Sequence, residues 1–180
     1  MKKLHIAITV FLFSIVLQAQ PGPTTFLDVV QVAGSKETVI EQLVDAGFEV
    51  LYHNSMVTGM YKGDKVKVTI YGWNEKHQQV SALSVIALET FESAEAIRRF
   101  NNRVSEYEKD PKYVADPANR KIPTGITLTH EYISDQRHFY SKFYQDGDKK
   151  KVIEVSIHEI DGKFYIPENY YNRYISNKNF

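Results

Sequence analysis

The residues with the clearest potential for chemistry are three histidines in the C-terminal part of the chain, His130, His138 and His158. If residues 134–136 form a hairpin loop, His130 and His138 become diagonal neighbours on one sheet face, and the next hairpin brings His158 close to His138. We expect no cofactor, with these histidines acting as polar packing residues, because one slip in register moves His158 to the other face. The alternative is a zinc site in a metal-binding protein or a hydrolase, since three imidazoles with an open fourth position are a catalytic zinc arrangement.

Aromatic residues form a second candidate site. Ten of the 23 aromatic residues fall in the last 43 positions, and consecutive aromatic pairs on strands must point to opposite faces. Exposed tyrosine and tryptophan rings supply contact area at low entropic cost, which favours a surface for a protein or glycan partner. The alternative is that the rings cover the second part of the sheet beneath a C-terminal helix. The predicted binding residues are Tyr71, Trp73, Tyr140, Tyr170 and Tyr171.

Three arginines on one predicted helix, Arg98, Arg99 and Arg103, form a small basic patch. The patch offers a place for an anion, or it is a solvated helix face paired to Glu95 and Glu106. Nucleophile elbows, phosphate-binding glycine loops, paired metalloprotease histidines and calcium loops each have spacing rules that this chain does not meet. We therefore predict no catalytic residue.

The composition excludes several classes of function. The chain has 180 residues, with 22 Lys plus Arg against 22 Asp plus Glu and no cysteine. A chain without cysteine has no thiol nucleophile, no Cys-ligated metal and no disulfide. Balanced charge lacks the excess of cations that a nucleic-acid binder uses, so no nucleic acid is expected as a partner.

The first 19 residues resemble a secretory signal peptide. Met1-Lys2-Lys3 is a cationic start, residues 4–17 are mostly apolar, and Ala19 precedes the helix-breaking Pro21-Gly22-Pro23. An apolar run of 14 residues is shorter than the roughly 20 that a membrane-spanning helix needs. The pattern predicts cleavage after Ala19, no membrane span in the product, and export to the periplasm or the medium; the alternative is an uncleaved anchor or a buried N-terminal helix.

Two main helices are expected in the exported chain. Ser35 is a suitable N-cap, apolar residues follow at helical spacing, and Gly47 suits the C-terminal end. The second helix begins at Ser93 and ends at Asp110, because the residue before Pro111 is pushed out of the helical region. A further helix is expected from Pro167, whose fixed φ suits a first turn.

Short runs of β-forming residues separated by turn residues predict an antiparallel sheet. The expected strands are 48–54, 56–61, 65–73, 80–88, 126–133, 138–145, 152–160 and 163–166. The fold class is therefore α+β, with residues 20–180 as one domain. Within it, two similar units, 34–89 and 93–175, would be joined through the loop 108–125; the alternative is one continuous sheet with two helices on one face.

Several short stretches are similar to those of a group of small exported proteins of Bacteroides-type bacteria whose function is uncharacterised. They are Gly34-Ser35-Lys36-Glu37 with Gly47-Phe48, Gly59-Met60-Tyr61, Arg99-Phe100-Asn101-Asn102, Ile122-Pro123, Phe143-Tyr144-Gln145 and Gly162-Lys163-Phe164-Tyr165-Ile166. The order of the elements also resembles the tandem helix-plus-sheet layout of the β-lactamase inhibitor protein fold. These resemblances imply export and an α+β architecture, and they transfer no catalytic residue.

Together these observations predict an exported, non-catalytic binding or interaction module of the cell envelope or the secreted fraction. The first alternative is the metal-dependent protein or hydrolase built on the three histidines. The second is a small inhibitor of a secreted enzyme, which the layout alone suggests.

Overall fold

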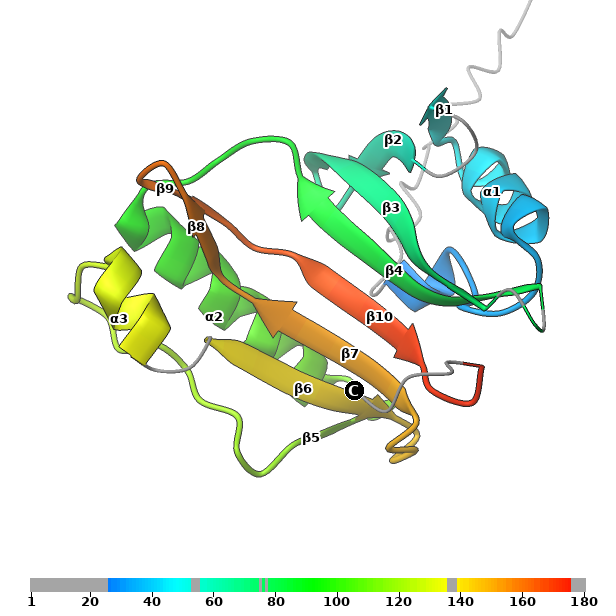
Figure 1. Ribbon diagram of the computed structural model, residues 1–180. Helices are drawn as coiled ribbons and strands as arrows, with labels where there is room; N and C mark the ends of the chain where they lie inside the picture. The colour runs from blue at the N-terminus through cyan, green and yellow to red at the C-terminus, as the bar shows by residue number, and fades with distance from the viewer. Residues whose placement is uncertain (1–25, 53–55, 75, 77, 136–138, 176–180) are drawn as a thin grey trace, which may run out of the picture.

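The computed structural model describes residues 26–52, 56–74, 76, 78–135 and 139–175. In the described residues a short 3-10 helix is followed by three α-helices and ten strands (Figure 1). The elements are η1 Phe26–Asp28, α1 Lys36–Asp45, β1 Glu49–Tyr52, β2 Met56–Tyr61, β3 Asp64–Asn74, β4 Gln79–Ala87, α2 Ser93–Lys109, β5 Tyr113–Ala115, α3 His130–Asp135, β6 Tyr140–Gln145, β7 Lys151–Ser156, β8 His158–Ile160, β9 Lys163–Tyr165 and β10 Glu168–Asn172.

The two expected main helices are confirmed. The Ser35 hydroxyl accepts a bond of 3.2 Å from the backbone N–H of Thr38 and so caps α1, whose apolar face is buried. The helix α2 buries one apolar stripe, and its last residue is Lys109, just before Asp110-Pro111. The stripe consists of Ala96, Ile97, Phe100, Val104 and Tyr107. Because these residues recur at helical spacing, the arginines of α2 fall beside the stripe.

One eight-stranded antiparallel sheet organises the molecule, in the order β1-β2-β3-β4-β10-β7-β6-β5. The strand β10 lies between β4 and β7, and Glu168 pairs with Val85 on one side and Val155 on the other. The late strand β10 therefore joins the strands that precede α2 to those that follow it. The α+β class is confirmed, and the strands of the two predicted units form one continuous sheet.

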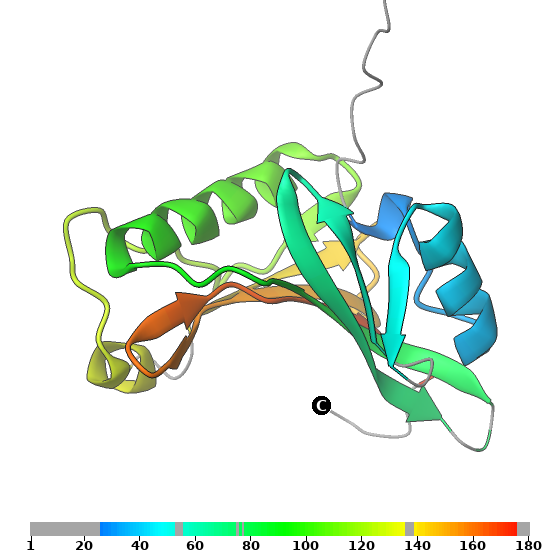
Figure 2. The same cartoon turned by 90° about the horizontal axis from the view of Figure 1, so that it is seen from above.

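Both main helices lie on the same side of the sheet, as the view from above shows (Figure 2). They share one continuous core, in which Leu43 of α1, Phe100 of α2, Leu83 of β4 and Phe143 of β6 are each 0% exposed. No helix in the described part of the chain covers the opposite face of the strands β3, β4, β10, β7 and β6. That open face carries partly and fully exposed side chains, among them Tyr71 and Tyr140.

Two expected elements are wrong. Residues 126–133, expected as a strand, form no strand, and α3 begins at His130. The Thr129 hydroxyl accepts the N–H of Tyr132 and its carbonyl accepts that of Ile133, so a local cap starts a helical turn there. The expected C-terminal helix from Pro167 is instead the strand β10, because a position between β4 and β7 satisfies backbone hydrogen bonds on both sides.

The remaining strands differ from the prediction in two details. The expected strand 152–160 divides into β7 and β8, and β8 pairs with β9 in a separate two-stranded sheet. This small sheet continues beyond the end of the main sheet, beside α3. The predicted loop 108–125 also contains the short edge strand β5.

Candidate functional site

A cleft of about 400 Å³ lies between α2, the β2–β3 turn and the start of β10. Its volume is within the range of small-molecule sites. One wall is apolar and the other is rich in charged side chains. The lining residues are Tyr61, Lys62, Gly63, Asp64, Val66, Val85, Ala87, Phe91, Arg98, Arg99, Asn102, Arg103, Glu106, Ile166 and Glu168.

Three segments that are distant in the sequence position the charged side chains. The helix α2 supplies Arg99 and Arg103, which stand one helical turn apart on the same side. The β2–β3 hairpin turns on Lys62 and Gly63, whose φ angles of 51° and 84° match a two-residue turn in which glycine is favoured. The first residue of β10, Glu168, reaches the cleft from the centre of the sheet.

A buried ion pair forms the floor of the cleft. Glu168 is only 3% exposed, and its Oε1 lies 2.6 Å from Nε of Arg103. Its other oxygen, Oε2, accepts hydrogen bonds from the hydroxyls of Tyr107 at 2.6 Å and Tyr170 at 2.7 Å. Both carboxylate oxygens are thus satisfied, which a buried charge requires.

The tyrosines around this pair remain protonated donors. Burial first, and then the negative charge of Glu168, raise the pKa of Tyr107 and of Tyr170 well above the usual value of 10.0. Burial also raises the pKa of Tyr61, with Glu168 as the next cause. Tyr61 lines the cleft, and its hydroxyl is buried. Among the described residues this hydroxyl has no hydrogen-bond partner of acceptable geometry, although the nearby Tyr170 acts to lower the pKa of Tyr61.

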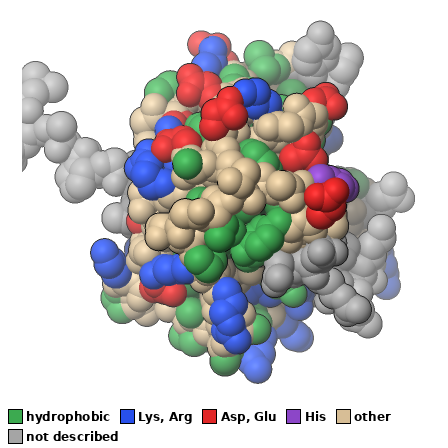
Figure 3. Space-filling view, turned by 90° about the vertical axis from the view of Figure 1, so that its left-hand side faces the viewer, with side chains coloured by type: hydrophobic (Ala, Val, Ile, Leu, Met, Phe, Trp, Pro, Cys, Tyr) green, Lys and Arg blue, Asp and Glu red, His purple; other side chains and the backbone are tan. Residues whose placement is uncertain are grey.

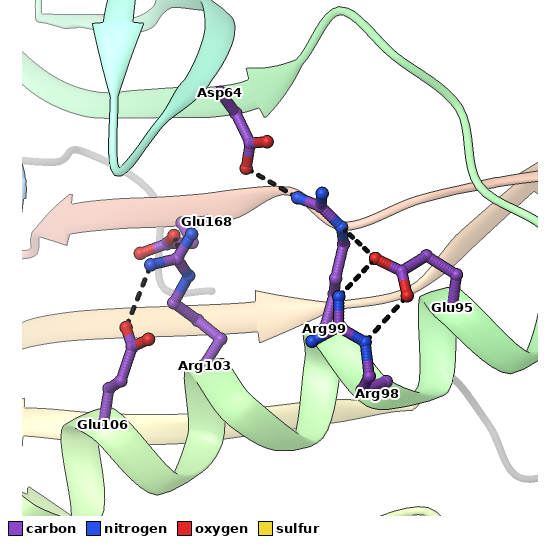
Figure 4. Close-up of polar contacts among 7 residues, drawn as sticks. All are labelled: Asp64, Glu95, Arg98, Arg99, Arg103, Glu106 and Glu168. Carbon is purple, nitrogen blue, oxygen red and sulfur yellow. Dashed lines mark hydrogen bonds and ion pairs between the residues drawn. The ribbon is translucent and has the colours of Figure 1, made fainter.

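A second set of ion pairs ties α2 to the beginning of β3 (Figure 4). Arg99 Nη1 lies 2.7 Å from Asp64 Oδ2, and its Nε donates to Glu95 at 2.7 Å. Arg98 makes two further bonds to the same Glu95 carboxylate. Hydrogen bonds from Arg98 and then Arg99 lower the pKa of Glu95 to about 2. The Arg99 guanidinium also lies 4.3 Å from the centre of the Phe91 ring, over the apolar wall.

The carboxylate of Glu106 bridges the hairpin and the helix. Its Oε2 pairs with the ammonium of Lys62 and lies 3.0 Å from Nη1 of Arg103. Partial burial works to raise the pKa of Glu106, but its ion pairs with Lys62 and Arg103 together lower it. The cleft and its rim then hold equal numbers of cations, Lys62, Arg98, Arg99 and Arg103, and anions, Asp64, Glu95, Glu106 and Glu168. Such groups recognise ligands through charge and hydrogen bonds.

The two described histidines of the candidate zinc trio are placed differently from the expected hairpin. His130 is the first residue of α3, and its Nδ1 lies 3.0 Å from Glu159 Oε2; His158 is on β8, with Nε2 3.1 Å from the Ser156 hydroxyl. His138 lies outside the described residues. At this end of the molecule histidine atoms adjoin acidic ones (Figure 3). No three His, Cys, Asp or Glu side chains of the described residues group as metal ligands, and the trio with His138 stays a prediction.

The predicted aromatic residues divide between two faces. Tyr71 and Tyr140 are 46% and 41% exposed on the open face of the sheet, where Tyr171 contacts Tyr71 edge-on at 6.1 Å. Tyr170, by contrast, is 1% exposed in the core, because β10 is a strand and successive side chains alternate. Trp73 is partly buried and packs against the core. The predicted surface position is therefore wrong for Tyr170, and a role in partner binding stays a prediction for the others.

Sequence reasoning singled out the arginines of the cleft but missed Glu168. The arginines pair with Glu95 and Glu106, as one of the two expectations has it, and they also line a cleft; anion binding by the patch stays a prediction. Glu168 was missed because residues from Pro167 were expected in a helix. If residues 168–170 are taken as a strand, their side chains alternate between the two faces of the sheet. This alternation was the one signal in the sequence that would have placed the Glu168 carboxylate on the side of α2.

Comparison with protein-family models, with curated proteins and with solved structures finds no match for this chain. Within the described residues, no helix combines the length and the apolar character that crossing a bilayer requires.

The buried ion pair predicts a large cost for removing its carboxylate. Glu168→Gln leaves the Arg103 guanidinium without its buried partner. We expect the free energy of unfolding to fall by about 3 kcal/mol. This value is at the lower end for a broken buried ion pair, because Glu106 still contacts Arg103. Urea unfolding measures the change. The double variant Arg103→Met/Glu168→Gln should recover much of the loss, whereas Glu154→Gln, which breaks a partly exposed contact to Lys142, should cost less than about 1 kcal/mol. Equal losses for Glu168→Gln and Glu154→Gln would contradict this assignment.

The lowered pKa of Glu95 predicts an effect on acid stability. A carboxylate whose pKa falls from 4.5 to about 2 on folding contributes stability above the higher value and loses it as pH falls toward the lower one. Glu95→Gln removes this contribution, so the difference in unfolding free energy between the wild type and the variant should shrink as pH falls through this window. Unfolding curves between pH 6 and about pH 2 test this. The control Glu131→Gln removes a carboxylate from α3, outside the cleft; a constant difference for Glu95→Gln would refute the prediction.

Proposed function

We propose that this chain is an exported, non-catalytic binding protein of the cell envelope or the secreted fraction, and that its ligand occupies the cleft between α2 and the β2–β3 hairpin. The observation that carries the proposal is the buried Arg103–Glu168 pair on the cleft floor, held by the hydroxyls of Tyr107 and Tyr170. A guanidinium fixed in this way keeps its orientation before any ligand arrives.

The ion pair is better explained by a role in ligand recognition than by a contribution to the stability of the fold. Replacement of a buried ion pair by well-packed apolar residues is often neutral or stabilising. Here the pair sits at the edge of an apolar wall made by Val66, Val85 and Ile166, where apolar side chains would also pack. A polar pair in such a place supports a role in orienting charge toward a ligand, and an apolar wall with a few convergent polar groups is typical of small-molecule sites.

Export is supported by the N-terminal sequence. A cationic start, an apolar run of 14 residues and Ala19 before Pro21-Gly22-Pro23 are typical of a cleaved leader, which lies outside the described residues. The lack of cysteine is compatible with an oxidising compartment, since no thiol can form an unwanted disulfide there.

Mass spectrometry of the protein from its native host tests the export part of the proposal. We expect the N-terminus at Gln20, from cleavage after Ala19, and recovery from the envelope or the medium. Val10→Arg places a charge in the apolar run and should retain the full-length chain inside the cell, because such a charge opposes membrane insertion of the leader. Native protein that begins at Met1 would refute export by this route.

The open face of the sheet offers a second contact, for a protein or glycan partner. Tyr71 and Tyr171 form an edge-on pair there, and the ammonium of Lys142 lies 4.5 Å from the centre of the Tyr140 ring. Rigid aromatic rings are enriched at binding surfaces. This contact is the alternative to the cleft as the principal binding site.

Native mass spectrometry with a low-molecular-mass extract of the host envelope and medium separates the two sites. We expect an adduct on the wild-type protein that is lost in Asn102→Trp, because Asn102 is an exposed residue of α2 that lines the cleft and an indole there obstructs the opening. Glu108→Trp, at an exposed position of the same helix that lines no part of this cleft, is the matched control and should keep the adduct. If the adduct is kept in Asn102→Trp but lost in Tyr71→Ala/Tyr171→Ala, the ligand binds the open face and the cleft proposal is overturned.

A further inference from the structure

One carboxylate in the cleft is more exposed than the other three. The exposed fractions of the acidic side chains are 4% for Glu168, 21% for Asp64, 36% for Glu95 and 50% for Glu106. Glu168 is fixed by three donors, and Glu95 by both Arg98 and Arg99. Glu106 contacts its two cations through a single oxygen, Oε2, and half of its side chain already faces solvent.

We propose that the ligand of this cleft carries a carboxylate that replaces the carboxylate of Glu106 between Lys62 and Arg103. This inference rests on the proposed function of the cleft and names the chemical class of its ligand. In the unliganded protein, Glu106 would then be an internal stand-in that occupies the position of the ligand's charged group.

The two cations do not depend on Glu106 for their positions. Arg103 is held from behind by Glu168, at 2.6 Å. The ammonium of Lys62 lies 5.4 Å from the centre of the Tyr61 ring and 5.8 Å from that of Tyr107, within the range of cation–π attraction, and the Lys62 side chain is only 16% exposed. When Glu106 turns outward, an ammonium and a guanidinium nitrogen therefore remain aimed at the position of one carboxylate oxygen.

The balance of charges in the cleft favours the exchange of one carboxylate for another over the addition of a further anion. The cleft and its rim hold four cations and four anions, so an added anion would meet an excess of carboxylates. If the ligand's carboxylate enters as that of Glu106 leaves, the number of close ion pairs does not change. The carboxylate of Glu106 becomes hydrated when it turns outward. The loss of its partly exposed ion pairs costs little, because such pairs contribute little to stability.

The rest of the cleft indicates the body of the ligand. Val66, Val85, Phe91 and Ile166 make an apolar wall next to the two cations. These features fit a small organic acid with an apolar body better than inorganic phosphate, which has no apolar surface to bury.

NMR titration with benzoate, benzamide and inorganic phosphate tests the proposal on the whole protein. Benzoate has the proposed carboxylate and an apolar ring, benzamide has the ring without the charge, and phosphate has charge without the ring. We expect benzoate to shift the signals of Lys62 and Arg103 and to bind more tightly than either comparison compound.

The variants then test the exchange itself. Glu106→Gln removes the internal competitor and should tighten benzoate binding about two- to fivefold, the range of partly exposed ion pairs. Glu108→Gln is the matched control, because it removes a half-exposed carboxylate of α2 that pairs with Lys121 outside the cleft, and it should leave the affinity unchanged. Lys62→Met should weaken benzoate binding, whereas Lys121→Met should not.

Unchanged or weaker benzoate binding in Glu106→Gln would overturn the exchange, and so would benzamide binding as well as benzoate. Binding of phosphate in preference to benzoate would overturn the assignment to an organic acid. Each of these results leaves the cleft proposal standing if the native adduct is still lost in Asn102→Trp, so the two failures are distinguishable.

Discussion

The ion pair between Glu168 and Arg103 is the interaction on which the arrangement of the site depends. A carboxylate that is 3% exposed at the centre of a sheet is tolerated only with donors on both oxygens. Those donors come from α2, through Arg103 and Tyr107, and from β10, through Tyr170. The position of α2 on the sheet is thereby specified by directional contacts in addition to apolar packing, which alone would tolerate sliding.

The same helix then determines where the β2–β3 hairpin lies. Arg99 reaches Asp64 at the first residue of β3, and Glu106 reaches Lys62 in the turn. Both contacts are partly exposed and each contributes little alone. Together they hold the hairpin beside α2 while leaving the cleft between them open. In the proposed exchange only the carboxylate of Glu106 would be replaced, and the Arg99–Asp64 pair would continue to hold the hairpin.

Much of the helical part of the fold was predictable from the sequence, and the reasons are local. Ser35 caps α1, and the stripe from Ile97 to Tyr107 has helical spacing that no strand can bury. The β2–β3 turn at Lys62-Gly63 was predictable because glycine at positive φ punctuates two β-forming runs. These elements carry most of the cations of the cleft, and so the arginine patch was visible in the sequence.

The position of β10, by contrast, depends on strands that are far away in the chain. Pro167 favours a helix start locally, but the N–H and C=O groups of residues 168–172 find partners on both β4 and β7. That pairing turns Glu168 and Tyr170 toward α2 and Tyr171 toward the open face. The acidic half of the site and the wrong expectation for Tyr170 thus have one physical cause, which is non-local strand pairing that overrides a local preference.

The chain as a whole carries 22 basic and 22 acidic side chains, so no strong overall field guides an anion to the cleft. In the proposed function, recognition in the cleft would come from short-range contacts, in which fixed donors replace water around a ligand's charge. In a cleft with equal numbers of cations and anions, a ligand's carboxylate can reach a cation only if one of the protein's own carboxylates is held less firmly than the others. If all four were held equally firmly, every cation would already be occupied. Buried Glu168 and half-exposed Glu106 represent the two extremes, and Arg103 contacts both of them. In the proposed exchange the buried contact would keep the guanidinium in place while the exposed one is replaced, so Arg103 would connect the stability of the fold to binding in the cleft.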